Sequence, residues 1–197
     1  MKKDGFYFLR VYPLVFMLIV TLICISIVTG LHLSTKSRVD ANENLFLRTT
    51  VLQAADVAVP EDFREVNTLF ESIVSEEDSF YKVSRADGSI SFVVPTEGAG
   101  LWGLIKLMVG FDEELEELTG IGIFAQNETP GLGARIEEEW YRTQFSGKQG
   151  PFVLVDEGAG DSPDEIDAIT GATRTSRAML SILNDVFVSG PAVVRGE

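Results

Sequence analysis

The stretch Asp167–Ser176 reads DAITGATRTS and lies near the C-terminal end of the chain. Its small-residue turn, residues 170–172, presents the hydroxyl group of Thr173 at the expected first turn of an amphipathic helix. The unpaired amides and the dipole at a helix N-terminus both favour a phosphate group. The stretch therefore predicts an anion site at Thr173, although a glycine turn of this kind also serves simply to begin a helix.

The helix that follows this stretch is predicted from the spacing of its apolar residues. They recur every three or four positions, which is typical of a helix packed on a core. These residues are Met179, Ile182, Leu183, Val186 and Phe187. Thr175 or Ser176 is expected to cap the free N–H groups at the beginning of the helix. Gly190-Pro191 is expected to end it.

The same stretch resembles the flavinylation motif D-x-x-(S/T)-G-A-T of the family formed by the Rnf G-subunit and the Nqr C-subunit, which are parts of ion-pumping redox complexes in bacterial membranes. Its defined positions are filled by Asp167, Thr170, Gly171, Ala172 and Thr173. In that family a separate flavin transferase joins FMN to the last threonine through a phosphoester. The resemblance implies covalently bound FMN on Thr173, a flavin transferase as maturation partner, and Thr175 at the same cofactor site.

Two roles are open for Asp167. A carboxylate beside a phosphate is repulsive in the finished product unless a cation or hydrogen bonds offset the repulsion. Asp167 is therefore expected either to position the acceptor hydroxyl or a metal ion during flavin transfer, or to cap the entry to the helix.

A second motif, ETPGLG at Glu128–Gly133, resembles the family signature whose loop lies against the flavin. Its proline fixes φ, and its glycines let the backbone approach a ligand closely. The resemblance implies a set of further cofactor-binding residues: Glu128, Thr129, Gly131, Leu132 and Gly133. The runs GLWG at 100–103 and FSGK at 145–148 extend the resemblance. Lys148 is expected either to pair with the flavin phosphate or to lie exposed.

The N-terminal region contains an apolar segment, residues 11–33, without a charged side chain. As a helix, this segment is long enough to cross the hydrocarbon layer of about 30 Å. It is longer than the core of a cleaved signal peptide, which is the competing interpretation, and a small-residue cleavage site is poorly matched. We expect a single-pass anchor in the lipid bilayer of the inner membrane.

The charges flanking the segment do not decide its orientation. The basic residues before it are Lys2, Lys3 and Arg10, and those after it include Lys36, Arg38 and Arg48. The positive-inside rule needs a larger difference than this. The family resemblance places the C-terminal domain on the periplasmic, extracytoplasmic side.

Composition excludes several classes of site. The net charge of −14 argues against binding nucleic acid. Cys24 is the only cysteine and His32 the only histidine, so disulfides, iron–sulfur clusters, haem attachment, zinc sites and Ser-His-Asp catalysis are excluded. No G-x-G-x-x-G fingerprint is present. We predict no catalytic residue and no resident metal.

The remaining elements are predicted from periodicity and turn signals. A stalk helix is expected over 34–56 and a second helix over 63–73, ended by the acidic turn 76–78. A hairpin over 81–94 turns at Asp87-Gly88. The hairpin is followed by a loop at 95–100 and by strands at 104–109 and 120–125. A helix over 134–145 and a strand at 151–155 come next. The acidic run 112–117 lacks the spacing of a calcium loop and is expected to be an exposed turn.

Together these features predict an α+β fold: one N-terminal transmembrane helix, then one extracytoplasmic FMN-binding domain with an antiparallel or mixed sheet flanked by helices. The expected boundaries are 1–33 for a short cytoplasmic tail and anchor, 34–78 for a stalk and helical lead-in, and 79–197 for the FMN-binding domain. The resemblance implies an electron-relay component that works with the other subunits of an Rnf or Nqr complex.

Two alternatives stay open: a stand-alone anchored flavoprotein reductase, and an anchored scaffold without flavin. The pumped ion, the redox partners and the choice between Rnf and Nqr are not decided by the sequence.

Overall fold

The computed structural model describes residue 5 and residues 11–196, so the basic residues of the predicted cytoplasmic tail, Lys2, Lys3 and Arg10, lie outside the described residues. The chain forms two compact units, Met1–Asn44 and Leu45–Glu197. Helix α2 (Tyr12–Ala54) runs without interruption through the apolar segment and the predicted stalk. By length and composition, α2 and the C-terminal helix α5 (Thr173–Arg195) are both long and apolar enough to span a membrane.

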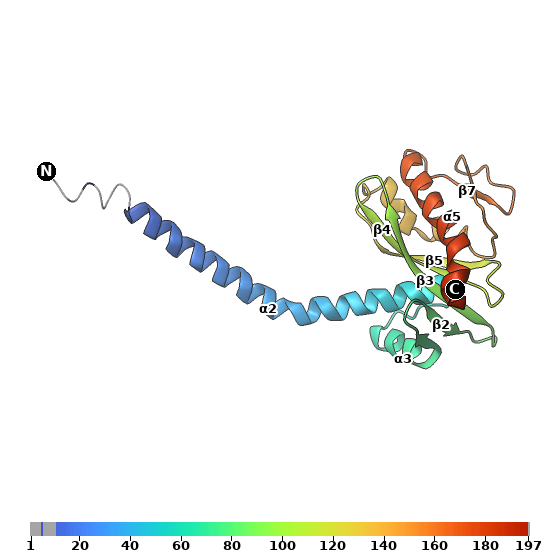
Figure 1. The fold of residues 1–197 in the computed structure, drawn as a ribbon, viewed down its shortest axis with the longest axis horizontal. Coiled ribbons are helices and arrows are strands. Elements are labelled where there is room, and N and C mark those ends of the chain that lie inside the picture. The colour runs from blue at the N-terminus through green and yellow to red at the C-terminus, as the bar shows by residue number, and fades with distance from the viewer. Residues whose placement is uncertain (1–4, 6–10, 197) are drawn as a thin grey trace. The chain divides into compact units, whose positions relative to one another are not determined.

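The second unit contains a five-stranded antiparallel sheet in which sequence neighbours pair, in the order β1-β2-β3-β4-β5. The strands are β1 (Val74–Glu76), β2 (Tyr81–Ser84), β3 (Ile90–Ala99), β4 (Leu104–Phe111) and β5 (Leu118–Ala125). A separate parallel pair joins β6 (Val153–Val155) to β7 (Glu165–Asp167). The predicted α+β class with an antiparallel sheet is confirmed (Figure 1).

Strand β4 shows why the sheet buries both of its faces. Alternate side chains of a strand point to opposite faces. Ile105, Leu107, Val109 and Phe111 belong to the core cluster that contains the buried face of α5. Met108 belongs to a second cluster, formed with the end of α2 and with α3 (Phe63–Ile73). The sheet is therefore held between two hydrophobic cores, and the predicted apolar run has the continuous pattern of a strand buried on both faces.

Glycines allow the last turns of α2 to lie directly on the sheet. A Cβ atom added at Gly110 would lie 2.0 Å from the carbonyl oxygen of Ala54, and one at Gly122 would lie 2.4 Å from that of Thr50. The hydroxyl group of Thr119 donates a hydrogen bond to the same Ala54 carbonyl, with a length of 2.8 Å. No side chain other than hydrogen fits between these backbones.

Helix α5 confirms the predicted apolar stripe and extends further than expected. Met179, Ile182, Leu183 and Val186 are buried, as the spacing indicated. The prediction that Gly190-Pro191 ends the helix is wrong. A proline removes one amide donor but leaves the flanking turns able to continue when packing supports them. The helix ends at Arg195, before Gly196 in the left-handed conformation with φ of 72°.

Three other predictions are corrected. Residues 95–99 are not a loop but the second half of β3, since each pairs with β4, from Pro95 opposite Met108 to Ala99 opposite Leu104. The helix predicted over 134–145 is broken by the extended backbone of Glu138 into a 3-10 turn, η2 (Gly133–Glu137), and a short helix, α4 (Glu139–Thr143). Strand β1, rather than the acidic turn 76–78, follows α3 directly.

The acidic run 112–117 forms the expected turn. Its first carboxylate, that of Asp112, accepts hydrogen bonds from the amides of Glu116 and Glu117. Among the described residues, no group of His, Cys, Asp and Glu side chains is arranged to hold a metal ion.

We expect Gly122→Ala to destabilise the domain by roughly 1–3 kcal/mol, because the added methyl group overpacks the contact between β5 and the end of α2. Urea unfolding of the full chain in detergent, followed by near-ultraviolet circular dichroism, measures the change. Ser84→Ala, at an exposed strand position, is the control. Equal midpoints for both variants would contradict a close contact at Gly122.

Candidate functional site

The carboxylate of Glu128 lies where three of the predicted motifs meet. It is 4% exposed. Its Oε2 accepts a hydrogen bond of 2.6 Å from the hydroxyl group of Thr175 on α5. Its Oε1 accepts hydrogen bonds from the amides of Leu101 (2.7 Å) and Trp102 (3.1 Å). The structure thus joins the ETPGLG motif to both GLWG and the DAITGATRTS stretch.

Two glycines provide the space around this carboxylate. A Cβ atom at Gly100 would lie 2.5 Å from Oε1 of Glu128, and one at Gly133 would lie 2.8 Å from Oε2 and 2.6 Å from the Thr175 hydroxyl oxygen. The close approach that was predicted for Gly133 therefore serves a contact within the protein chain.

The TGAT turn places Thr173 on the surface as the first residue of α5. Gly171 has a φ of 79°, in the left-handed region that glycine adopts without strain. The amide of Ala172 donates to the carbonyl of Ile169 and closes the turn. Ala172 is the N-cap and makes no side-chain capping hydrogen bond. The hydroxyl group of Thr173 is therefore accessible beside the first-turn amides of a 23-residue helix.

The prediction that Thr175 or Ser176 caps α5 is wrong, because both side chains are buried beneath the first turn. Thr175 donates to Glu128. The hydroxyl group of Ser176 accepts from the amide of Ile169 at 3.0 Å and donates to the carbonyl of Ala172. These two residues hold the helix start from inside and leave its outer side without a cap.

The remaining residues of the second motif lie on the surface next to the turn. Thr129, Gly131 and Leu132 are exposed. The carbonyl of Thr129 accepts hydrogen bonds from the amides of Leu132 and Ala134, which closes the loop. A Cβ atom at Gly171 would lie 3.2 Å from Cδ2 of Leu132. The two predicted motifs are therefore in contact.

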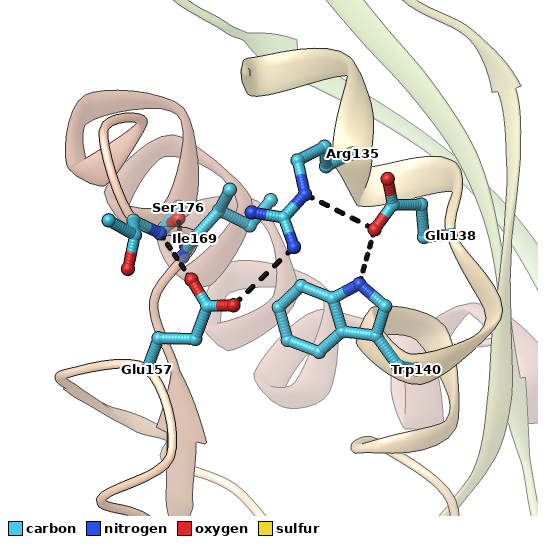
Figure 2. A network of polar contacts seen from close by, with 7 residues as sticks. Arg135, Glu138, Trp140, Glu157, Ile169 and Ser176 are labelled. Carbon is cyan, nitrogen blue, oxygen red and sulfur yellow. Dashed lines mark hydrogen bonds and ion pairs between the residues drawn. The ribbon is translucent and has the colours of Figure 1, made fainter. Parts of the chain in front are cut away.

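A network of polar contacts ties the turn to the loop that precedes β7. Figure 2 shows Arg135 between the carboxylates of Glu138 and Glu157, with ion-pair distances of 3.2 and 3.4 Å. The other carboxylate oxygen of Glu157 accepts a 2.7 Å hydrogen bond from the amide of Thr170. The guanidinium group of Arg135 also lies 5.2 Å from the centre of the Trp140 ring.

This network favours the charged form of Glu157. Hydrogen bonding by the side chain and amide of Thr170, followed by the hydrogen bond and charge of Arg135, holds the pKa of Glu157 below its usual range. The sequence pattern did not indicate this residue, because its partners lie far away along the chain.

Asp167 and Lys148 both make hydrogen bonds within the domain. Asp167 lies in β7, where its carboxylate accepts a 2.9 Å hydrogen bond from the amide of Gly160 and its own amide donates to Gln144. It does not cap α5. Lys148 is half-buried and donates to the carbonyl of Glu165. Neither side chain is directed at Thr173 by any of these contacts.

The TGAT turn and the two loops that meet at Glu128 expose groups suited to an anion and to an apolar ring. First-turn amides and the exposed Arg174 and Arg177 are suited to an anion. Large apolar side chains are exposed in the two loops that converge on Glu128: Leu101 (38%), Trp102 (68%) and Leu132 (43%). The spacing of apolar residues did not predict this exposure, although the GLWG run pointed to the loop.

Comparison with known proteins finds a family match in the region that contains these motifs. The family "FMN-binding domain" matches residues 100–188, which includes all three motifs. The chain is 33% identical over 107 residues to the C-subunit of the Na(+)-translocating NADH-quinone reductase of Vibrio anguillarum, a match covering 50% of this chain and 42% of that protein. The chain thus spans less than half the length of these curated relatives.

A shorter relative is covered more completely. The G-subunit of the proton-translocating ferredoxin:NAD(+) oxidoreductase complex of Clostridium ljungdahlii is 31% identical over 132 residues, which covers 62% of this chain and 70% of that protein.

Crystal structures of the C-subunit of the Na(+)-translocating NADH-quinone reductase have the same fold. That from Parabacteroides distasonis superposes with a TM-score of 0.68 at 22% identity, covering 80% of this chain and 96% of its own. That from Shewanella oneidensis gives a TM-score of 0.59 at 22% identity, covering 72% and 90%.

We expect Glu157→Gln to lower the melting temperature at neutral pH, because it removes the charge that pairs with Arg135. The pKa of Glu157 is lowered in the folded state, so its contribution is present above the ordinary glutamate pKa of about 4.3 and is lost as the pH falls through the folded value. Thermal unfolding at pH 7 and pH 3 measures the difference. The difference between the two proteins should be smaller at pH 3 than at pH 7; an equal difference at both pH values would show that the charge is not the cause.

Proposed function

Because this chain belongs to the family of the Nqr C-subunit and the Rnf G-subunit, we propose that it is an electron-relay subunit of a membrane-bound, ion-translocating oxidoreductase and carries FMN on Thr173 through a phosphoester. The observation that carries the proposal is the exposed hydroxyl group of Thr173 at the uncapped start of α5, in the last position of the TGAT turn. A buried threonine could not accept a cofactor without opening the core.

The residues around Thr173 divide the binding between the two parts of the cofactor. The first-turn amides of α5, with Arg174 and Arg177, would hold the phosphate. The exposed apolar side chains of Leu101, Trp102 and Leu132 would lie against the ring. When bound, FMN supplies the redox chemistry, and the chain supplies binding and orientation.

The chain is proposed to pass electrons between neighbouring subunits and to have little activity alone. The absence of a nicotinamide-binding fingerprint from the sequence and of any residue set suited to a soluble substrate supports a relay. Ion translocation is assigned to other subunits, since the apolar segment 11–33 contains no Asp, Glu, Lys or Arg side chain.

Placement in the membrane follows from the same proposal. The exposed apolar part of α2 would cross the inner membrane once and carry the folded domain on the periplasmic side, where a flavin transferase would load it. Copurification with multi-span subunits would distinguish this complex from a stand-alone flavoprotein reductase, and covalent flavin would exclude a scaffold.

We expect the intact mass of the full chain, purified from cells that contain the flavin transferase, to exceed the sequence mass by FMN less one water. Thr173→Ala should remove this increment completely, whereas Thr173→Ser, which keeps a hydroxyl group, should retain part of it. Mass spectrometry of the peptide containing residue 173 locates the increment. An unmodified parent protein from such cells would contradict the proposed cofactor.

Asp167 is proposed to assist the transfer of FMN to Thr173. We expect Asp167→Ala and Asp167→Asn both to lower the modified fraction measured by intact mass. Asparagine keeps an acceptor for the Gly160 amide and therefore controls for the loss of that hydrogen bond. Full modification of Asp167→Ala would contradict the role, and rescue by asparagine would assign the residue to holding the loop instead.

A further inference from the structure

We propose that Glu128 is a positioning residue, which ties the loop 100–103 and the loop 128–133 to α5 without itself touching the cofactor. This inference rests on the proposed function where it concerns FMN. It revises the role expected from the sequence, in which Glu128 was one of the cofactor-binding residues.

The hydrogen bonds of Glu128 use both of its carboxylate oxygens. Oε1 accepts from two successive backbone amides, those of Leu101 and Trp102, and Oε2 accepts from the hydroxyl group of Thr175. With 4% of the residue exposed, almost no surface is left for a ligand. A carboxylate in this position holds its three donors in place, and it thereby holds together the segments to which those donors belong.

The donors lie in segments that are distant in sequence. Leu101 and Trp102 precede β4, and Thr175 is two residues beyond the acceptor Thr173. Because both oxygens of this buried carboxylate accept hydrogen bonds, its three donors are held close to it. The carboxylate therefore fixes the distance between the exposed Trp102 loop and the start of α5.

The close approach of the backbone makes this arrangement specific. Cβ atoms at Gly100 and Gly133 would come within 2.5 and 2.8 Å of the two carboxylate oxygens. The chain is therefore folded tightly around the group, and a smaller side chain at 128 would leave a buried space and two amides without an acceptor.

The consequence is a prepared apolar surface beside Thr173. The backbone amides of Leu101 and Trp102 are connected through the Glu128 carboxylate to the helix that bears the acceptor hydroxyl. A binding surface held in this way keeps its geometry before the ligand arrives, which reduces the ordering that binding requires.

The first experiment tests the positioning role in protein without flavin, through the fluorescence anisotropy of Trp102. The chain contains two tryptophans, Trp102 and Trp140, so Trp140→Phe leaves Trp102 as the only tryptophan reporter. In this background, produced as full chain in detergent without the transferase, Glu128→Ala should lower the fluorescence anisotropy of Trp102 markedly. Glu128→Gln should restore it, because its side-chain oxygen accepts from the amides and its nitrogen donates to Thr175. Glu139→Ala, at an exposed glutamate, should have no effect.

Thr175→Val keeps the inference testable if Glu128→Ala does not fold. It removes the Oε2 hydrogen bond alone and should lower the anisotropy less than Glu128→Ala does. Combining the two substitutions should add nothing to the effect of Glu128→Ala, because both act through one interaction. An unchanged Trp102 anisotropy in Glu128→Ala or in Thr175→Val, in folded protein, would overturn the positioning role.

The second measurement reads the consequence for the cofactor. In protein produced with the transferase, Glu128→Ala should lose much of the visible circular dichroism of the flavin, and Glu128→Gln should recover it. A flavin signal that changes in Glu128→Ala while Trp102 does not would assign Glu128 to direct contact and overturn the inference. If the parent chain carries no flavin, the proposed function fails, and the Trp102 measurement still decides the role of Glu128.

Discussion

The rotation of α5 about its axis is the constraint on which the site depends. A helix turns by 100° per residue, so fixing a few side chains inside fixes the direction of all the others. Thr175, Ser176 and Met179 are buried, and each is held by packing or by a hydrogen bond to another segment. The orientation of the helix then places Thr173 on its exposed side. The exposure of one hydroxyl group is therefore a property of the whole core beneath the sheet, and not of the TGAT turn alone.

Three kinds of interaction hold α5 and its first turn: apolar packing, buried hydrogen bonds and a surface ion pair. Apolar packing between α5 and the sheet sets the helix in place but tolerates small shifts, since it is not directional. The hydrogen bonds of Glu128 and Ser176 are directional and fix the start of the helix against the neighbouring loops. Glu157 and Arg135 add a third tie at the surface, where solvent weakens it.

Much of the fold could be predicted from the sequence, because periodicity reports burial directly. The α5 stripe, the hairpin at Asp87-Gly88 and the strands β4 and β5 all have patterns that one local segment is enough to produce. Predictions failed where a distant partner decided the outcome. Pro95 suggests a loop, but β4 supplies a strand pairing there. The contact between Glu128 and Thr175 joins residues 47 positions apart, so no local pattern contains it. The motifs themselves were identified by family resemblance, which gave the candidate site residues but did not indicate which of them are buried.

The exposed position of Thr173 also bears on the order of events in the life of the chain. An acceptor that became accessible only in an unfolded or partly opened state would have to be modified before the core closed. Here Thr173 is exposed on a helix whose inner face is already packed, so under the proposed function the folded chain would itself be the substrate for modification. Folding and loading would then be uncoupled: an apo-protein would reach its final fold without flavin, and the supply of flavin would limit only the fraction of the protein that is loaded.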